Sequence, residues 1–195
     1  MFIDMTLESI ELKKFDMKKI QFNSQKSQGP LILIIGRRDT GKSFLVRDLL
    51  YYHQDIPIEA VISPTEPGNG FYSELVPKCF IHDEWCNNAI IENLLKSKYN
   101  KSLCIFENTS YTGEELSRLL FNKMLVIAEQ IFYWVPSNIW DRADYTFILR
   151  NTIKRNRRSI YENYTDIFPN FDAFCTIMDH CTENYECMVI ARNTK

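Results

Sequence analysis

The chain has 195 residues, which is enough for one sizeable hydrophobic core and too few for two comfortable domains. Hydrophobic residues make up 45% and charged residues 25%, as is typical of a soluble globular domain. The formal net charge of −2 excludes the strongly basic composition of a dedicated nucleic-acid-binding protein, so any nucleic-acid contact must come from a local basic patch.

Apolar stretches in the sequence are short. The longest aliphatic run is Leu31 to Ile35, far below the ~20 apolar residues that a membrane-spanning helix needs. The first residues also lack the continuous apolar segment of a secretory signal. The six cysteines include no C-x-x-C pair. We therefore expect a soluble protein that stays inside a cell, with reduced cysteines and neither a zinc site nor a disulfide framework.

The order of predicted elements indicates the fold class. Residues 1–29 are predicted to be a polar, turn-rich lead-in, and residues 30–195 to form one domain. Short apolar runs predict strands at 31–36, 60–63, 79–81, 103–106, 124–128, 145–149 and 186–190. Helical periodicity predicts helices at 41–53, 70–76, 87–98, 113–122, 152–164 and 171–180. This alternation predicts an α/β fold, with a mainly parallel central sheet that is covered by helices on both faces.

A complete phosphate-loop motif, G-x-x-x-x-G-K-[S/T], lies between the first predicted strand and the first predicted helix. It consists of Gly36, Arg37, Arg38, Asp39, Thr40, Gly41, Lys42 and Ser43. The glycines allow a turn whose N–H groups point inward as an anion nest, and the helix adds its partial positive end. The alternative is an ordinary strand–turn–helix junction that happens to contain GKS, but the strand before and the helix after the motif favour a phosphate loop. The motif therefore predicts a P-loop NTPase that binds ATP, with Lys42 on the β- and γ-phosphates and Ser43 on Mg²⁺.

A hydrolytic site also needs acidic or polar groups at the ends of neighbouring strands. Glu107 follows the strand 103–106 and is the candidate second holder of Mg²⁺. Asn108 stands where a second acid is expected, and an amide can position water but cannot accept its proton. Glu66 is a possible substitute base, with a solvated loop acid as the alternative interpretation. Gln130 follows the strand 124–128 and is either a sensor of the γ-phosphate or an exposed strand end.

The segment 150–158 is the best local basic feature. It contains Arg150, Lys154, Arg155, Arg157 and Arg158. At about 100° per residue, Arg157 falls on the apolar side of the predicted helix and should be partly buried or face a subunit interface. Three interpretations remain open: a solvated charged face, contacts with the DNA backbone, or an arginine offered to a neighbouring subunit's γ-phosphate.

Several long stretches together resemble the genome-packaging ATPases of large nucleocytoplasmic DNA viruses, a poxvirus-type branch of the FtsK/HerA-type P-loop motors. The matching stretches are GRRDTGKSFLVRDLLYYHQDIP (36–57), VISPTE (61–66), FYSELVPKCFIHDE (71–84), DYTFILRNTIKRNRRSIYENY (144–164) and IFPNFDAFCTIMDHCTENYECMVI (167–190). The resemblance implies an ATP-driven motor, in a homo-oligomeric ring, that translocates double-stranded DNA into a capsid. It further implies capsid components as partners, a place in the host cytoplasm at the virus factory and in the virion, and a sensor role for Gln130.

The sequence departs from the family pattern in the middle. Glu107 and Asn108 replace two adjacent aspartates, and the segment up to Gln130 is shorter. Trp140 stands at the position of the family's arginine, with Arg142 nearby. Two functions therefore stay open, an active DNA-packaging ATPase and a hydrolysis-deficient, nucleotide-binding paralogue with a structural or regulatory role. A small-molecule kinase is a weaker alternative, because the chain lacks an arginine-rich lid and an acceptor site.

Overall fold

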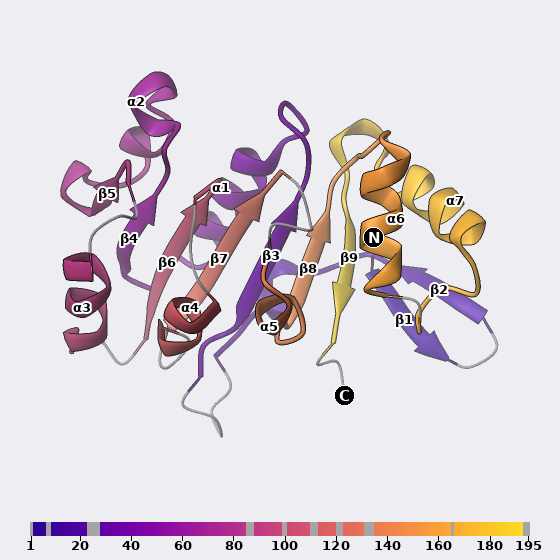
Figure 1. The fold of residues 1–195 in the computed structure, drawn as a ribbon, viewed down its shortest axis with the longest axis horizontal. Coiled ribbons are helices and arrows are strands. Elements are labelled where there is room, and N and C mark those ends of the chain that lie inside the picture. The colour runs from indigo at the N-terminus through magenta and orange to yellow at the C-terminus, as the bar shows by residue number, and fades with distance from the viewer. Residues whose placement is uncertain are drawn as a thin grey trace.

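The computed structural model shows an α/β architecture around one central sheet (Figure 1). It describes residues 2–6, 9–22, 28–84, 88–98, 101–109, 113–119, 123–130, 135–164 and 166–192. Within these residues the sheet has nine strands in the order β2-β1-β9-β8-β3-β7-β6-β4-β5. The strands are β1 (Phe2–Thr6), β2 (Ser9–Lys13), β3 (Leu31–Ile35), β4 (Ile58–Ile62), β5 (Ile81–His82), β6 (Ser102–Glu107), β7 (Lys123–Glu129), β8 (Tyr145–Ile148) and β9 (Met188–Ala191).

The middle of the sheet is parallel, as the sequence predicts. Strand β3 pairs in parallel with β7 on one side and β8 on the other, and β6 pairs in parallel with β7 and β4. The antiparallel pairs are β8 with β9 and β1 with β2. Because the carboxyl ends of parallel strands meet at one edge, the residues that follow β3, β4, β6, β7 and β8 gather along the same edge of the sheet.

Helices cover both faces of the sheet. The helices are α1 (Lys42–Tyr52), α2 (Glu66–Asn69), α3 (Asn88–Lys96), α4 (Gly113–Leu119), α5 (Ser137–Trp140), α6 (Lys154–Glu162) and α7 (Phe171–Cys181). The 3-10 helices are η1 (Met17–Lys19), η2 (Tyr72–Glu74), η3 (Lys78–Phe80) and η5 (Glu183–Tyr185). Residues of α3 to α7 pack in the core cluster on one face, whereas α1 and the segment around η1 and η2 pack on the other.

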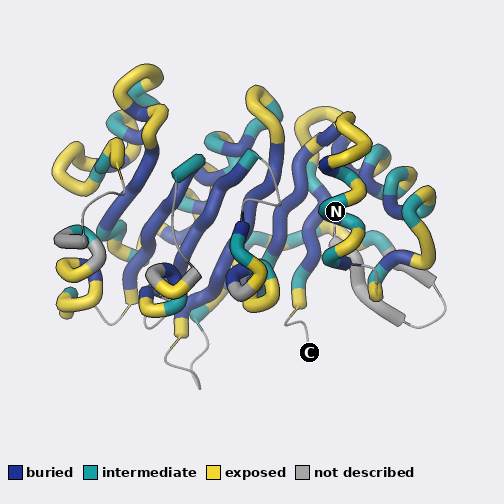
Figure 2. The backbone as a smooth tube through the Cα atoms, viewed as in Figure 1, coloured by how far each residue is buried: buried dark blue, intermediate teal, exposed yellow. Residues whose placement is uncertain are grey.

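Burial on both faces explains the uninterrupted aliphatic runs. Every residue of β3 is at most 1% exposed, with Leu33 facing one core cluster and Ile34 facing the other. Strands β6 and β7 are buried along their whole length in the same way, as the dark tube in Figure 2 shows. A strand that is covered twice needs apolar side chains at every position, which is why this part of the sequence shows no period-two alternation.

The N-terminal segment differs from the prediction. Residues 1–29 were expected to be a polar lead-in, but β1 and β2 form a hairpin, and Phe2 pairs with Val189 of β9. Further along the chain, Ile20 is completely buried in the core cluster on the face of the sheet that α1 covers. The packed structure therefore begins before residue 30. The alternation of apolar and polar residues over 9–13 was the signal that could have predicted β2.

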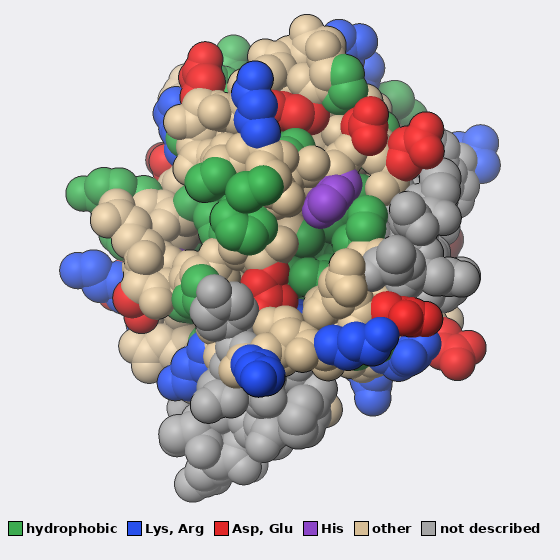
Figure 3. Space-filling model, turned by 90° about the vertical axis from the view of Figure 1, so that its left-hand side faces the viewer, with side chains coloured by type: hydrophobic (Ala, Val, Ile, Leu, Met, Phe, Trp, Pro, Cys, Tyr) green, Lys and Arg blue, Asp and Glu red, His purple; other side chains and the backbone are tan. Residues whose placement is uncertain are grey.

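Smaller details of burial also emerge from the structure. In α1, Val46 and Leu49 are buried, whereas Tyr52 is 44% exposed. Leu95 of α3 is also exposed, whereas Leu94 is buried. The strand expected at 79–81 is the short edge strand β5, because residues 78–80 form the 3-10 helix η3. The side of the molecule beside β5 presents hydrophobic side chains to solvent, and Leu75 and Phe80 are each 39% exposed (Figure 3).

Two other predictions concern membranes and cysteines. Among the described residues, no helix combines the length and the apolar character that crossing a membrane requires. Cys79, Cys104 and Cys175 are free thiols, and Cys86 lies outside the described residues.

Candidate phosphate-binding site

The phosphate loop connects β3 to α1 at the carboxyl edge of the sheet. Its two glycines are required for different reasons. Gly41 has a φ of 100°, in the left-handed region that favours glycine. Gly36 is required by crowding, because a Cβ there would lie 2.7 Å from the Thr40 hydroxyl oxygen and 2.9 Å from Leu149. The Thr40 hydroxyl also donates a hydrogen bond of 2.7 Å to the carbonyl of Arg37, which closes the turn.

Backbone N–H groups of the loop are available for an anion. None of the backbone hydrogen bonds between described residues outside the regular helices and strands starts from an N–H group of residues 37–43. Asp39 contributes to this geometry with a φ of 62°. Successive N–H groups in such a turn, followed by a helix N-terminus, form a nest that binds phosphate. The loop therefore has the conformation that its motif predicts.

Lys42 lies inside the loop rather than in solvent. Its side chain is 7% exposed, and its ammonium donates hydrogen bonds of 2.9 Å to the Gly36 carbonyl and 3.1 Å to the Arg37 carbonyl. Burial lowers the pKa of Lys42, and the nearby charges of Glu107 and Glu129 oppose that shift. The loop thus holds a desolvated cation beside the N–H groups, where it strengthens the attraction for phosphate oxygens.

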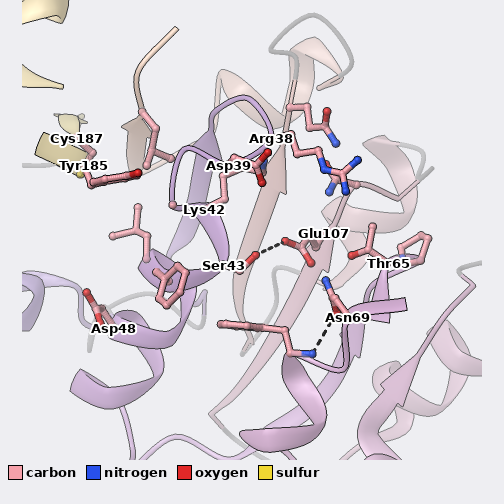
Figure 4. Close-up of a pocket in the computed structure, with 18 of the residues that line it drawn as sticks. Arg38, Asp39, Lys42, Ser43, Asp48, Thr65, Asn69, Glu107, Tyr185 and Cys187 are labelled. Atoms are coloured by element: carbon pink, nitrogen blue, oxygen red, sulfur yellow. Dashed lines mark hydrogen bonds between the residues drawn. The ribbon is translucent and has the colours of Figure 1, made fainter. Parts of the chain in front are cut away.

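Glu107 connects the loop to the strands on the far side of β7. One of its carboxylate oxygens accepts a hydrogen bond of 3.0 Å from the Ser43 hydroxyl, and the other accepts one of 2.9 Å from the Ser63 hydroxyl. Ser63 follows β4 and is completely buried. The structure therefore brings the two predicted Mg²⁺ holders, Ser43 and Glu107, into contact (Figure 4).

A buried tyrosine lies next to the same carboxylate. Tyr72 of η2 is completely buried, and burial together with the charges of Glu107 and Glu66 raises its pKa well above the ordinary value. Its phenol therefore stays protonated and neutral beside Glu107. Neither Ser63 nor Tyr72 was predicted as part of the site. The only available signal for Ser63 was its polar side chain at the last position of the strand predicted at 60–63.

Asn108 and Gln130 both line the pocket at the loop. Asn108 has a φ of 47°, and its N–H donates a hydrogen bond of 3.0 Å to the Ala128 carbonyl of β7. Gln130 directly follows β7 and is half-buried. The pocket has a volume of about 1170 Å³, and the acidic residues among its described lining are Asp39, Asp48 and Glu107.

Glu66 does not lie where a substitute base is needed. It is 9% exposed, and its two oxygens accept hydrogen bonds of 2.8 Å from the N–H groups of Tyr72 and Ser73. It does not line the pocket at the loop but a separate shallow depression with Lys78 and Asp83. The prediction of Glu66 as a base is therefore wrong, because its carboxylate binds the start of η2.

We expect Glu66→Ala to destabilise the fold by about 1–3 kcal/mol, because two backbone N–H groups at the start of η2 would lose their acceptor. Urea unfolding would measure this loss. Glu74→Ala, which removes an exposed acid of the same 3-10 helix, is the matched control and should change stability by less than about 0.5 kcal/mol. A folded Glu66→Ala chain of unchanged stability would contradict the structural role.

The comparisons with known proteins agree with this geometry. No protein-family model matches the sequence. Uncharacterized protein 075L of Invertebrate iridescent virus 6 is 30% identical over 94% of this chain and 80% of its own length. Uncharacterized protein 088R of Invertebrate iridescent virus 3 is also 30% identical, over 93% of this chain and 78% of its own length. The chain belongs to this iridescent virus family. A mimivirus relative, Uncharacterized protein L437, is 29% identical over 95% of the chain.

The fold of this family member is that of the viral genome-packaging NTPases. The genome packaging NTPase B204 from Sulfolobus turreted icosahedral virus 2, in complex with AMP, matches with a TM-score of 0.58 and 16% identity. That match covers 86% of this chain and 94% of the B204 chain. The same NTPase in complex with sulfate gives a TM-score of 0.59 at 15% identity, over 86% and 93% of the two chains. The predicted P-loop NTPase fold is therefore confirmed.

The basic segment of this family member lies partly against its own chain. Arg157 is partly buried, as its position predicts, and it forms an ion pair with Asp179 of α7. That pairing lowers the pKa of Asp179. Arg158 places its guanidinium 4.4 Å from the ring centre of Phe171. Both residues thus contact α7 from α6, and Arg158 is nevertheless exposed.

The remaining basic residues face solvent. Arg150, Lys154 and Arg155 are exposed. The segment lies next to the phosphate loop, because Arg37 donates a hydrogen bond of 3.2 Å to the Thr152 hydroxyl. Ile160 of α6 and Tyr164 just after it are buried, whereas Ile153, which caps the start of α6, is 43% exposed.

Proposed function

We propose that this chain binds ATP with Mg²⁺ and hydrolyses it to translocate viral double-stranded DNA into a capsid, as a subunit of an oligomeric ring. The observation that supports nucleotide binding best is the contact between Ser43 of the loop and Glu107 of β6, beside the open N–H groups and the buried Lys42. The packaging role is supported by the shared fold with NTPases named for genome packaging and by relatives from large DNA viruses.

The residues present fit Mg²⁺. This ion prefers oxygen ligands, and it is typically held by one or two protein groups together with substrate phosphates. Ser43 and Glu107 are the groups that would hold it, and among the described residues no three acidic, histidine or cysteine side chains gather into an all-protein metal site. Bound there, Mg²⁺ would neutralise charge on the β- and γ-phosphates.

The protein's own groups then have separate tasks. The loop N–H groups and Lys42 bind phosphate oxygens and stabilise the charge that develops on them. Ser63 keeps the Glu107 carboxylate oriented through its hydroxyl, which donates a hydrogen bond of 2.9 Å. Asn108 and Gln130 line the pocket at the ends of β6 and β7, and their proposed task is to orient an attacking water. An amide does not accept the water's proton, so Asn108 orients without acting as a base.

The exposed basic residues supply the proposed DNA contact. Arg150, Lys154 and Arg155 would bind phosphates of the DNA backbone, which gives affinity without reading sequence. We propose that this takes place in the host cytoplasm, where new capsids are filled, with capsid components as partners. Binding through a few phosphate contacts must weaken steeply as salt concentration rises.

We expect duplex DNA to stimulate ATP turnover, and the stimulation to fall when Lys154 and Arg155 are both changed to glutamine. Steady-state ATPase assays with random-sequence duplexes, at several salt concentrations, would measure it. The matched control is Lys14→Gln with Lys18→Gln, which removes two exposed charges from the segment that packs on the opposite face of the sheet. Salt-insensitive or strongly sequence-specific DNA binding would contradict the proposal.

A hydrolysis-deficient subunit is the second candidate. It is favoured by Asn108 at the expected position of an acid and by the engagement of Glu66 with η2. The same assay separates the two candidates. DNA-stimulated turnover supports the motor, whereas tight ATP binding without turnover, with or without DNA, supports the structural or regulatory subunit.

A further inference from the structure

The turn between α7 and β9 holds two residues in an unusual backbone conformation. Asn184 has a φ of 50° and Tyr185 has a φ of 63°, so a bulky aromatic residue occupies the left-handed region. Non-glycine residues there are uncommon, and they cluster at ligand sites. The other described non-glycine residues with positive φ are Asp39 and Asn108, and both line the pocket at the phosphate loop.

Hydrogen bonds fix this turn. The Thr182 hydroxyl donates a bond of 2.7 Å to the Met178 carbonyl at the end of α7, and the Glu186 N–H donates one of 2.8 Å to the Glu183 carbonyl. Within the described part of the chain, the Tyr185 side chain nevertheless takes part in no aromatic pair or hydrogen bond, and the residue is 83% exposed. The fold therefore uses a strained turn to present an aromatic ring to solvent.

The ring lies directly beside the phosphate loop. A Cβ built on Gly41 would lie 3.9 Å from Cδ1 of Tyr185 and 3.7 Å from Cδ2 of Leu149. Tyr185, Leu149 and Cys187 all line the same pocket as Lys42 and Ser43. Leu149 is buried, and its N–H is fixed on the Ile35 carbonyl at 2.8 Å, so the apolar floor beneath the ring is rigid.

The pocket has two chemically different sides. Figure 4 shows Glu107 and Thr65 on one side of Lys42 and Ser43, and Tyr185 and Cys187 on the other. The first side has the oxygen ligands, and the second is apolar and aromatic. A ligand whose phosphates bind the loop thus extends its other end either toward Glu107 or toward Tyr185.

We propose that Tyr185 forms one wall of a nucleobase subsite, in which its ring stacks on the base of a nucleotide whose phosphates lie on the loop. This inference rests on the proposed function, because the phosphate position defines where the base can reach. An exposed aromatic face next to an apolar floor suits the flat π-face of a base, and stacking of this kind tolerates different bases. The strained turn between α7 and β9 then has a function, because it positions the Tyr185 ring beside the phosphate loop.

Calorimetric titration would test the subsite with two ligands, a non-hydrolysable ATP analogue and inorganic tripolyphosphate, each with Mg²⁺. We expect Tyr185→Ala to weaken binding of the ATP analogue by about tenfold and to leave binding of tripolyphosphate unchanged. Tyr185→Phe, which keeps the ring, should stay within about twofold of the unmodified chain. The matched control is Tyr51→Ala, which removes a tyrosine that is 69% exposed on α1 and does not line the pocket.

Two outcomes would overturn the subsite while the proposed function stands: unchanged affinity of Tyr185→Ala for the ATP analogue, or an equal loss for tripolyphosphate, which would indicate an effect on the loop itself. If the unmodified chain bound neither ligand, the proposed function would fail, and the subsite with it. Tyr185→Leu keeps apolar bulk without a ring, and it replaces the alanine variant if that chain does not fold. A leucine variant with unchanged affinity for the ATP analogue would also overturn the proposal.

Discussion

Lys42→Ala should weaken nucleotide binding by about 100-fold or more, because the loop loses the desolvated cation that faces the β- and γ-phosphates. In the present structure the Lys42 ammonium donates hydrogen bonds to the carbonyls of Gly36 and Arg37, and the residue is only 7% exposed. Its charge is therefore already placed and largely stripped of water before any phosphate arrives. Calorimetric titration with ATP and Mg²⁺ would measure the loss.

The control for this variant must separate binding from folding. Lys42→Ala removes two hydrogen bonds but also removes a buried charge, so we expect its free energy of unfolding to change by no more than about 2 kcal/mol. Arg47→Ala is a matched control, since it removes an exposed cation of the same helix whose guanidinium lies 4.7 Å from the Phe44 ring centre. Equal ATP affinity and turnover in the Lys42→Ala chain would refute the assignment of the loop.

Glu107→Gln should abolish the effect of Mg²⁺ on this protein. The substitution keeps the size of the side chain and a hydrogen-bonding group near Ser43 and Ser63, but it removes the charge that would hold the ion. If the chain hydrolyses ATP, we expect turnover to fall by about 100-fold or more. If it only binds ATP, we expect the gain in affinity that Mg²⁺ provides to disappear, with binding in EDTA unchanged.

The matched control for Glu107→Gln is Glu129→Gln. Both carboxylates are buried and both raise the pKa of Lys42, but only Glu107 lines the pocket and bonds to Ser43. If only Glu107→Gln loses the effect of Mg²⁺ on ATP binding or turnover, the loss shows that Glu107 holds the ion. An equal loss in both variants would show instead that the two carboxylates act through the charge of Lys42. Magnesium titrations of ATP binding and turnover, run on both variants, would make this comparison.

The sequence was sufficient for the centre of the fold and for the loop. Strands β3, β6 and β7 were predictable because burial on both faces leaves an unbroken aliphatic run. The loop was predictable because its glycines, lysine and serine must occur at fixed spacing to fold around an anion. Glu107 was found by its place directly after the strand predicted at 103–106, since the site requires an acid at a neighbouring strand end.

The remainder of the site depended on which strands are neighbours. Ser63 contacts Glu107 only because β4 lies next to β6, and no local pattern states that order. Glu66 was assigned wrongly, because binding to the N–H groups of η2 leaves no periodic signal in the sequence. For Arg157, the helical position predicted partial burial correctly. Its ion-pair partner Asp179 could not be predicted, because it lies on another helix.

Strand order also determines when the site can exist during folding. Ser43 of α1 and Glu107 of β6 are 64 residues apart in the sequence, and β7 lies between β6 and the strand β3 that precedes α1. Contacts of such long range form slowly, because the intervening chain must first be ordered. A ligand that needs both residues therefore binds only the assembled sheet. At a concentration of 100 times its dissociation constant, such a ligand would stabilise β3, β7 and β6 as a unit by about 2.7 kcal/mol.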